Sequence, residues 1–194
     1  LVAKYSDTYP QDTAGPLLFW KQDMRKAFRQ LPGDADSQKF GAIGVRNPDS
    51  NLIEVLIHRS LPFGARAAPI LFCSVALVLC QIAASFYSIP VMAFVDDFFS
   101  AAPSQMAQQN FDLFKDLLKT LGFFLKEEKE TPPTQKGPLL GVEVSLRENG
   151  AGSFSLSDTR RKYYLARVQQ VLKDDYISPG DAAKPAEGPK GKTL

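Results

Sequence analysis

Runs of apolar residues alternate with turn-forming residues along most of the chain. A short apolar run, or strict alternation of apolar and polar positions, is typical of a strand, whereas apolar residues three and four apart are typical of a helix. These patterns predict strands at residues 17–22, 39–45, 52–58, 140–146 and 154–156, and a tight hairpin over 91–100. They predict helices at 67–84, 104–121 and 158–173, and a short helical turn over 24–30. This order of elements predicts an α+β fold, with an antiparallel sheet covered by helices mainly on one face.

Turn and cap residues support these boundaries. Residues 47–50 (Asn-Pro-Asp-Ser) are a good hairpin turn, and Asn149-Gly150 is another. Pro69 falls in the first turn of its helix, where the missing amide costs little. Ser104 can cap the next helix, and Gly122 can end it. Two helices are expected to bury one apolar face each, formed by Phe111, Phe114, Leu117, Leu118 and Leu121 in one and by Tyr164, Leu165, Val168, Val171 and Leu172 in the other.

Residues 67–84 hold no charge and approach the shortest length of a membrane-spanning helix. Ser74 and Gln81 interrupt this stretch, and no Lys or Arg cluster flanks its far end, so we expect a soluble core helix buried on most sides and no membrane association. Cys73 and Cys80 share a face of this helix about two turns apart, too far for a disulfide. Buried free thiols in a reducing compartment are expected.

Composition fits one globular domain, because 44% of the 194 residues are hydrophobic and 23% are charged. The formal charge of +2 is too small to indicate nucleic-acid binding by itself. Residues 1–11 contain no apolar signal segment, so an intracellular location, cytoplasmic or nuclear, is expected. Residues 179–194 are rich in Pro, Gly, Ala and Lys and are expected to be loosely ordered.

The hairpin over 91–100 carries two adjacent acids, Asp96 and Asp97, at its tip. Like charges this close repel and raise each other's pKa unless a cation neutralises them. Asp23 also ends a buried strand, and the three carboxylates converge if the two strand ends adjoin in one sheet. Such oxygen ligands suit Mg²⁺, and a pair of ions could support an in-line displacement at phosphate. By itself an Asp-Asp pair is more often a solvated turn.

Five short motifs change this assessment because they occur in one order. They are Asp23-Met24-Arg25-Lys26-Ala27-Phe28, Leu61-Pro62-Phe63-Gly64 with Pro69, Phe94-Val95-Asp96-Asp97, Leu121-Gly122-Phe123 with Lys129, and Leu139-Leu140-Gly141. The series closely resembles the successive palm motifs of reverse transcriptases, which are RNA-directed DNA polymerases and nucleotidyltransferases. The Leu-Pro-Phe-Gly and Phe-Val-Asp-Asp forms resemble those of retrotransposons, of the DIRS-like or LTR type, more than those of retroviruses.

The resemblance implies which residues carry the chemistry. Asp23 and Asp96 match the two metal-binding acids, and Asp97 matches an acid that supports them. The backbone carbonyl of Met24 would join the shell of two Mg²⁺ ions, or of Mn²⁺. Lys129 matches a motif lysine near the triphosphate, where it could act as a general acid. A lone Lys in a Lys-Glu run is equally typical of a solvated surface charge.

The resemblance also places the incoming nucleotide. Phe28 matches an aromatic side chain beneath the sugar, where a ribose 2′-hydroxyl would clash, so dNTPs would be preferred. A core Phe on a short helix is the alternative interpretation. The residues expected to bind the nucleotide are Met24, Arg25, Lys26, Ala27, Phe28, Phe63 and Gly64.

Template and primer would contact the last third of the chain. Leu140 and Gly141 match the hairpin that grips the primer end. The helix that follows is basic on the face opposite its apolar residues, where the family begins its thumb, and it would contact phosphates without reading sequence. These basic residues are Arg160, Arg161, Lys162, Arg167 and Lys173. A merely solvated face is the alternative.

The resemblance divides the chain into a palm at 1–156 with partial fingers at 33–60, the start of a thumb at 157–178, and the tail. Phe94 stands where tyrosine is commonest in the family, a mild change. Only 22 residues precede Asp23, too few for the fingers strands that clamp the triphosphate, so a fragment or a decayed copy is expected. Besides an active polymerase, an inactive relic that binds nucleic acid or serves as a scaffold is therefore considered. An RNA-templated RNA polymerase is disfavoured by Phe28 and Val95.

Overall fold

The computed structural model describes residues 15–147, 151–174 and 176. The chain forms two compact units. The first holds the described part of residues 1–135 with Arg147 and Ala151, and the second holds residues 136–146 and the described part of 152–194. The predicted turn at Asn149-Gly150 and the tail at 179–194 lie outside the described residues.

An antiparallel four-stranded sheet forms the centre of the first unit. Its strand order is β4-β5-β1-β6. The strands are β1 (Leu17–Asp23), β4 (Met92–Phe94), β5 (Asp97–Pro103) and β6 (Thr131–Thr134). β1 and β5 pair along their whole length, from Leu17 opposite Pro103 to Asp23 opposite Asp97. The predicted strand over 17–22 and the hairpin over 91–100 are therefore confirmed.

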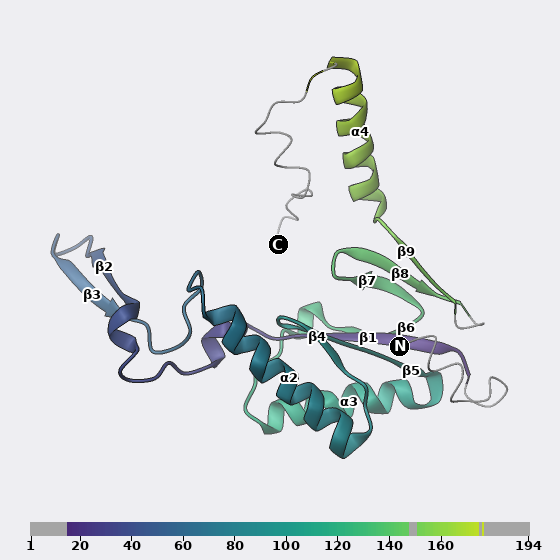
Figure 1. Cartoon of the computed structure of the whole chain (residues 1–194), viewed down its shortest axis with the longest axis horizontal. Coiled ribbons are helices and arrows are strands. Elements are labelled where there is room, and N and C mark those ends of the chain that lie inside the picture. Colours follow the sequence, from purple (N-terminus) through teal and green to yellow (C-terminus); the bar gives the residue numbers. More distant parts are fainter. Residues whose placement is uncertain (1–14, 148–150, 175, 177–194) are drawn as a thin grey trace. The chain divides into compact units, whose positions relative to one another are not determined.

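Two helices, α2 (Ala68–Tyr87) and α3 (Ser104–Thr120), lie on the same side of this sheet (Figure 1). Successive strand residues point to opposite faces, so Trp20 and Gln22 of β1 face the helices. The Trp20 ring lies 5.7 Å from that of Phe114, and Phe114 lies 5.4 Å from Phe98 of β5. The amide Nε2 of Gln22 donates to the carbonyl of Phe111, 2.9 Å away. The α+β fold with helices on one face is thus confirmed.

Helix α2 has only one buried face, which corrects the expectation that most of its sides are covered. The buried residues follow helical spacing and are Ala68, Phe72, Ala76, Leu79 and Ala83. Ile70, Leu77 and Phe86, on the rest of its surface, are exposed. In length and composition α2 would suffice to cross a bilayer, but a soluble core helix passes the same criterion. Both cysteines are free, and burial raises the pKa of the Cys80 thiol to about 11.

The ends of α3 differ in part from the prediction. Ser104 is its first helical residue rather than its cap, because Pro103 occupies the cap position and no side chain caps the helix. Leu121 follows the last turn and is exposed. Gly122 ends the helix as predicted, with a positive φ of 85° that glycine adopts without strain.

A short hairpin follows β1 in the chain. The helical turn η1 (Ala27–Gln30) leads through η2 (Gln38–Gly41) into β2 (Ala42–Arg46) and β3 (Ile53–Ile57). The predicted strand at 39–45 therefore begins as a 3₁₀ turn. Asn47 closes the hairpin: its side-chain oxygen accepts hydrogen bonds from the amides of Asp49 and Ser50.

The second unit contains a three-stranded antiparallel sheet and one helix. They are β7 (Lys136–Leu139), β8 (Val142–Leu146), β9 (Gly152–Ser155) and α4 (Asp158–Asp174). Leu140 belongs to the turn before β8 rather than to the strand, with φ at 48°. No described residue of α4 is buried, so the expected buried face is wrong. Leu165, Val168 and Leu172 are among its exposed residues.

Candidate active site

Two of the predicted acids face each other across the central sheet. Asp23 is the last residue of β1 and Asp97 is the first residue of β5, and they are directly paired. Side chains of directly opposed residues lie on the same face of an antiparallel pair. Because Trp20 and Gln22 point to the helices, Asp23 points to the other face, away from the core. The register thus brings together carboxylates that are far apart in sequence.

The third acid, Asp96, lies in the two-residue turn between β4 and β5. Phe94 pairs with Asp97, so only Val95 and Asp96 form the loop. Val95 adopts a φ of 55°, which a β-branched residue rarely does and which marks local strain. The backbone oxygen of Asp96 accepts a hydrogen bond from the Met24 amide, 3.2 Å away. This bond fixes the turn beside the end of β1, so all three predicted acids lie at one place.

The surroundings of Asp23 oppose its ionisation. Burial raises the pKa of the Asp23 carboxyl, and the negative charges of Asp97 and Asp96 raise it further. The positive charges of Lys21 and Lys129 act in the opposite direction without cancelling the rise. Excess negative charge at a half-enclosed carboxylate is the condition in which a bound cation stabilises the ionised form.

Two lysines already approach these acids. The Lys21 ammonium lies 2.7 Å from Oδ1 of Asp97 and 4.0 Å from Oδ2 of Asp23. The Lys129 ammonium lies 3.9 Å from the same Asp23 oxygen, so Lys129 lies beside the acids, and its catalytic role stays a prediction. Lys21 was not among the predicted site residues. Its signal was a charged residue within the apolar run of β1, two positions before Asp23 and therefore on the same strand face.

The acids are neighbours, but their side chains are not gathered into a ready ligand set. In the described part of the chain no three His, Cys, Asp or Glu side chains are grouped so that they could hold one metal ion. The expected full convergence of three carboxylates is therefore only partly realised. One carboxylate oxygen of Asp97 is instead bound to Lys21 on the neighbouring strand β1.

Lys129 is positioned by ion pairs behind it. It ends the turn η3 (Glu127–Lys129), which follows α3 in the chain. The Lys115 ammonium on α3 lies 2.8 Å from Glu130 and 3.3 Å from Glu127. Lys119, one turn further along α3, also lies 3.3 Å from Glu127. These pairs on both sides of the turn hold Lys129 next to Asp23.

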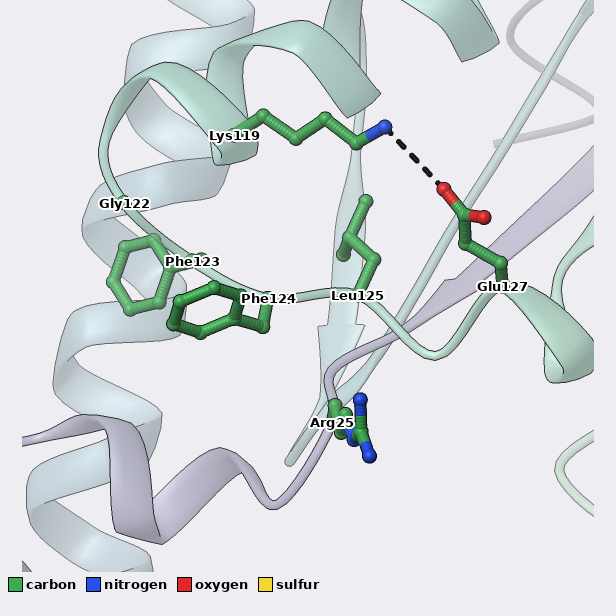
Figure 2. Close-up of a pocket in the computed structure, with 7 residues that line it drawn as sticks. All are labelled: Arg25, Lys119, Gly122, Phe123, Phe124, Leu125 and Glu127. Carbon is green, nitrogen blue, oxygen red and sulfur yellow. Dashed lines mark hydrogen bonds and ion pairs between the residues drawn. The ribbon is translucent and has the colours of Figure 1, made fainter.

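The segment after β1 is fastened to the segment before η3. Gln30 makes three hydrogen bonds here: Nε2 donates to the carbonyls of Arg25 and Phe124, and Oε1 accepts from the Phe124 amide. A pocket of about 400 Å³ lies beside this segment, and its lining includes Arg25, Phe123 and Phe124 (Figure 2). The backbone from Asp23 to Phe28 is thus held firmly, and it includes the exposed residues Arg25 and Lys26 and the buried residues Met24 and Ala27.

Phe28 and Phe63 are brought together, as the predicted nucleotide site requires. Their ring centroids are 5.3 Å apart, in an edge-to-face arrangement, and Phe28 also contacts Phe72 of α2 at 5.4 Å. Phe28 is half-buried and Phe63 is exposed. Gly64 follows with a φ of 87°, and a Cβ there would meet no atom within 4 Å. Glycine is therefore favoured at this position by the positive φ and not by lack of space. Phe28 therefore packs against the core and is also partly exposed to solvent.

In the second unit Gly141 and Arg160 are in contact. The Arg160 guanidinium donates to the Gly141 carbonyl, which ties α4 to the turn at Leu140 and Gly141. Helical pitch places Arg160 and Arg167 on one side of α4 and Lys162 about half a turn away. The basic residues therefore surround the helix instead of forming a single face, which corrects the expectation of one basic face.

Comparison with known proteins decides the family. The family model described as "Reverse transcriptase (RNA-dependent DNA polymerase)" matches residues 6–144. The chain belongs to the reverse transcriptase family. This match includes Asp23, Asp96, Asp97 and Lys129, and the α+β fold agrees with a reverse transcriptase palm. A search of curated protein sequences gives no match.

Solved structures with this reverse transcriptase fold include three of foamy viral protease-reverse transcriptase. The dRH form in complex with ds DNA has 17% identity and a TM-score of 0.61, over 84% of this chain and 24% of that chain. The complex with RNA/DNA hybrid has 16% identity and a TM-score of 0.60, over 85% and 22%. A further complex with dsDNA has 18% identity and a TM-score of 0.58, over 80% and 31%. The chain thus spans less than a third of the length of each.

The raised pKa of Asp23 predicts a pH-dependent stability of this reverse transcriptase domain. The folded pKa exceeds the ordinary value of 3.8, so the contribution of Asp23 is fully present below pH 3.8 and is lost as the pH rises through the folded pKa. Asp23→Asn removes this loss. Without divalent ions, the variant should be more stable than the wild type at pH 7, and the difference should shrink toward pH 4.

Urea unfolding at both pH values, with a chelator present, measures this effect. Asp116→Asn, an exposed acid on α3, is the control and should change stability little at either pH. A variant that is less stable at pH 7 would mean that the ion pairs of Asp23 with Lys21 and Lys129 outweigh its burial.

Proposed function

We propose that the chain is the palm of an RNA-directed DNA polymerase that extends a primer by nucleotidyl transfer. The observation that carries the proposal is the β1–β5 register, which sets Asp23 opposite Asp97 with Asp96 in the adjoining turn. Within a reverse transcriptase domain this is the place where a primer end and a triphosphate would react. A retrotransposon of the DIRS-like or LTR type is the proposed source, and the protein acts inside the cell, in the cytoplasm or nucleus.

The acids suit a divalent cation, because Asp23 is buried beside the negative charges of Asp97 and Asp96, and its pKa stays raised although Lys21 and Lys129 lie near it. Asp23 and Asp96 would hold Mg²⁺, or Mn²⁺, together with the Met24 carbonyl, and Asp97 would support them. When bound, two such ions lower the barrier to attack by the primer hydroxyl and stabilise the leaving pyrophosphate. The strands supply the positions, since each acid is at a strand end or in the tight turn.

The incoming dNTP would lie along the segment from Asp23 to Phe28, which Gln30 fastens to the segment before η3. The exposed Arg25 and Lys26 would face the triphosphate, and Lys129 would approach it from the other side of Asp23. A half-exposed lysine at this place can donate a proton to the leaving group. Phe63 and Gly64 would form the floor of the site.

Template and primer would be bound largely through phosphates. Leu140 and Gly141 would contact the primer end, and Arg161 and Lys162, both exposed on α4, would contact the backbone of the duplex. Arg160 and Arg167 would contribute at the side of α4 that faces Gly141. Such contacts add affinity without sequence preference. Foamy viral protease-reverse transcriptase is known in complex with dsDNA and with RNA/DNA hybrid, which supports a nucleic-acid partner here.

Primer extension on an RNA template tests the proposed activity. The 194-residue chain, and any longer protein that contains it, should incorporate dNTPs in the presence of Mg²⁺ and lose this activity on chelation. Binding of a primer–template duplex is measured in parallel. Duplex binding without extension, in the chain and in the longer protein, would instead support the inactive relic.

Phe28→Ala should relax the selection against ribonucleotides. Phe28 packs against Phe72 and Phe63 and stays partly exposed, so its ring would be fixed in place and could block a 2′-hydroxyl. Removing it should reduce the dNTP over NTP preference by roughly 10- to 100-fold, the effect of about 1–3 kcal/mol in a shape-selective site. Single-nucleotide incorporation of dCTP and CTP measures the ratio. Phe40→Ala, an exposed phenylalanine on η2, is the control, and an unchanged ratio in Phe28→Ala would remove this residue from the selection.

A further inference from the structure

Lys21 lies beside the acid cluster formed by Asp23, Asp96 and Asp97, and it is largely buried there. It is on β1, two residues before Asp23, and its side chain is 15% exposed. Its ammonium lies nearer to the Asp97 carboxylate, at 2.7 Å, than to that of Asp23, at 4.0 Å. A lysine in this position supplies the acids with a positive charge from the strand that also carries Asp23.

Lys129 does not share this arrangement, although it also carries a positive charge beside Asp23. Its side chain is 49% exposed, and among the described residues it forms an ion pair with Asp23, at 3.9 Å. Lys21 is thus the lysine whose ion pair engages Asp97. An ion pair with limited exposure is screened less by water than a surface pair, so the Lys21–Asp97 contact affects the charge that Asp97 offers to other cations.

We propose that Lys21 is a positioning residue whose ammonium is a built-in counter-ion of Asp97. By occupying Asp97, Lys21 weakens the binding of divalent ions to the acid cluster before a nucleotide binds. The inference rests on the proposed function. With Asp97 engaged by Lys21, Asp23 and Asp96 remain as the carboxylates offered to an ion. Mg²⁺ is commonly held by one or two carboxylates together with substrate phosphates, so the ion would bind tightly only together with the triphosphate.

The arrangement has a use for a polymerase. Without Lys21, the paired acids Asp23 and Asp97 would have less positive charge beside them and would attract divalent ions more strongly in the absence of substrate. With Lys21, part of that charge is neutralised from within the sheet. Lys21 would therefore couple tight ion binding to nucleotide binding, and it would also hold the Asp97 carboxylate toward β1.

Binding of Mn²⁺ in the absence of nucleotide tests the proposal, measured by calorimetry and by the electron paramagnetic resonance signal of free Mn²⁺. In the 194-residue chain, Lys21→Met should tighten Mn²⁺ binding roughly tenfold, because the positive charge that competes with the ion for Asp97 is lost. Lys21→Arg keeps the charge and should retain weak binding. Lys39→Met makes the same change of net charge on η2 and should leave the affinity unchanged.

A double-mutant cycle tests whether Lys21 affects Mn²⁺ affinity through its ion pair with Asp97. In an Asp97→Asn background, Lys21→Met should tighten Mn²⁺ binding clearly less than it does in the wild type, because the contact with Asp97 is gone and only the effect of the Lys21 charge beside Asp23 remains. An equal gain in both backgrounds would overturn the specific pairing. Unchanged or weaker binding in Lys21→Met would overturn the proposal as a whole.

Two controls separate this inference from the proposed function. Asp23→Asn should weaken Mn²⁺ binding at least about tenfold, and if it does not, the metal site itself is wrong rather than the role of Lys21. Circular dichroism and thermal unfolding show whether each variant folds. If Lys21→Met does not fold, Lys21→Gln, which is neutral but can donate to Asp97, is expected to tighten Mn²⁺ binding in the same direction, and weaker or unchanged binding there overturns the proposal.

Discussion

Asp96→Asn should abolish primer extension while leaving duplex binding nearly intact. Asp96 lies in a two-residue turn that is fixed to the Met24 backbone, so replacing its carboxylate by an amide changes the charge with little change of shape. The loss of one ligand charge at a divalent ion costs several kcal/mol of transition-state stabilisation, on the order of 10³-fold in rate or more. Single-turnover extension at saturating duplex measures the chemical step.

The control for this prediction is Asp116→Asn on α3, an exposed acid with the same change of charge, which should extend primers at the wild-type rate. Duplex affinity is measured for both variants by fluorescence anisotropy. Extension by Asp96→Asn at a rate within tenfold of wild type would contradict the assignment of Asp96 as a metal ligand. A parallel loss of duplex binding would indicate a misfolded turn instead.

Phe114→Ala should give the largest loss of stability in the first unit. Phe114 is fully buried between Trp20 of β1 and Phe98 of β5, and it joins α3 to the two strands that position the acids. Truncation of a buried phenylalanine removes these contacts and leaves a cavity, at a cost of about 3–5 kcal/mol. Urea unfolding followed by circular dichroism measures the free energy of unfolding.

Phe124→Ala makes the same chemical change at a side chain that is 71% exposed, and it should alter the free energy of unfolding by about 0.5 kcal/mol or less. The two variants make the same chemical change, so a difference in their stability reports the burial of the Phe114 ring. A Phe114→Ala loss as small as that of Phe124→Ala would mean that the packing between α3 and the sheet is not what stabilises this unit.

Local sequence patterns predicted the elements of the first unit well. The apolar run that ends at Asp23, the hairpin around Asp96 and Asp97, and the end of α3 at Gly122 all agree with the structure. These features depend on residues within a few positions of each other, whose backbone preferences act locally. Predictions that needed distant partners were less accurate. Leu121 is exposed, most of the surface of α2 is not buried, and no described residue of α4 is buried.

The sequence by itself determined the α+β class, the family motifs, and which acids are candidates for chemistry. Only the tertiary structure decided that Asp23 stands directly opposite Asp97 and that Lys21 binds Asp97. The physical reason is that alternation along a strand fixes the face on which a side chain lies, whereas the neighbour across the sheet depends on the register between distant strands. The same register determines how far each carboxylate is removed from water and which charge it meets there.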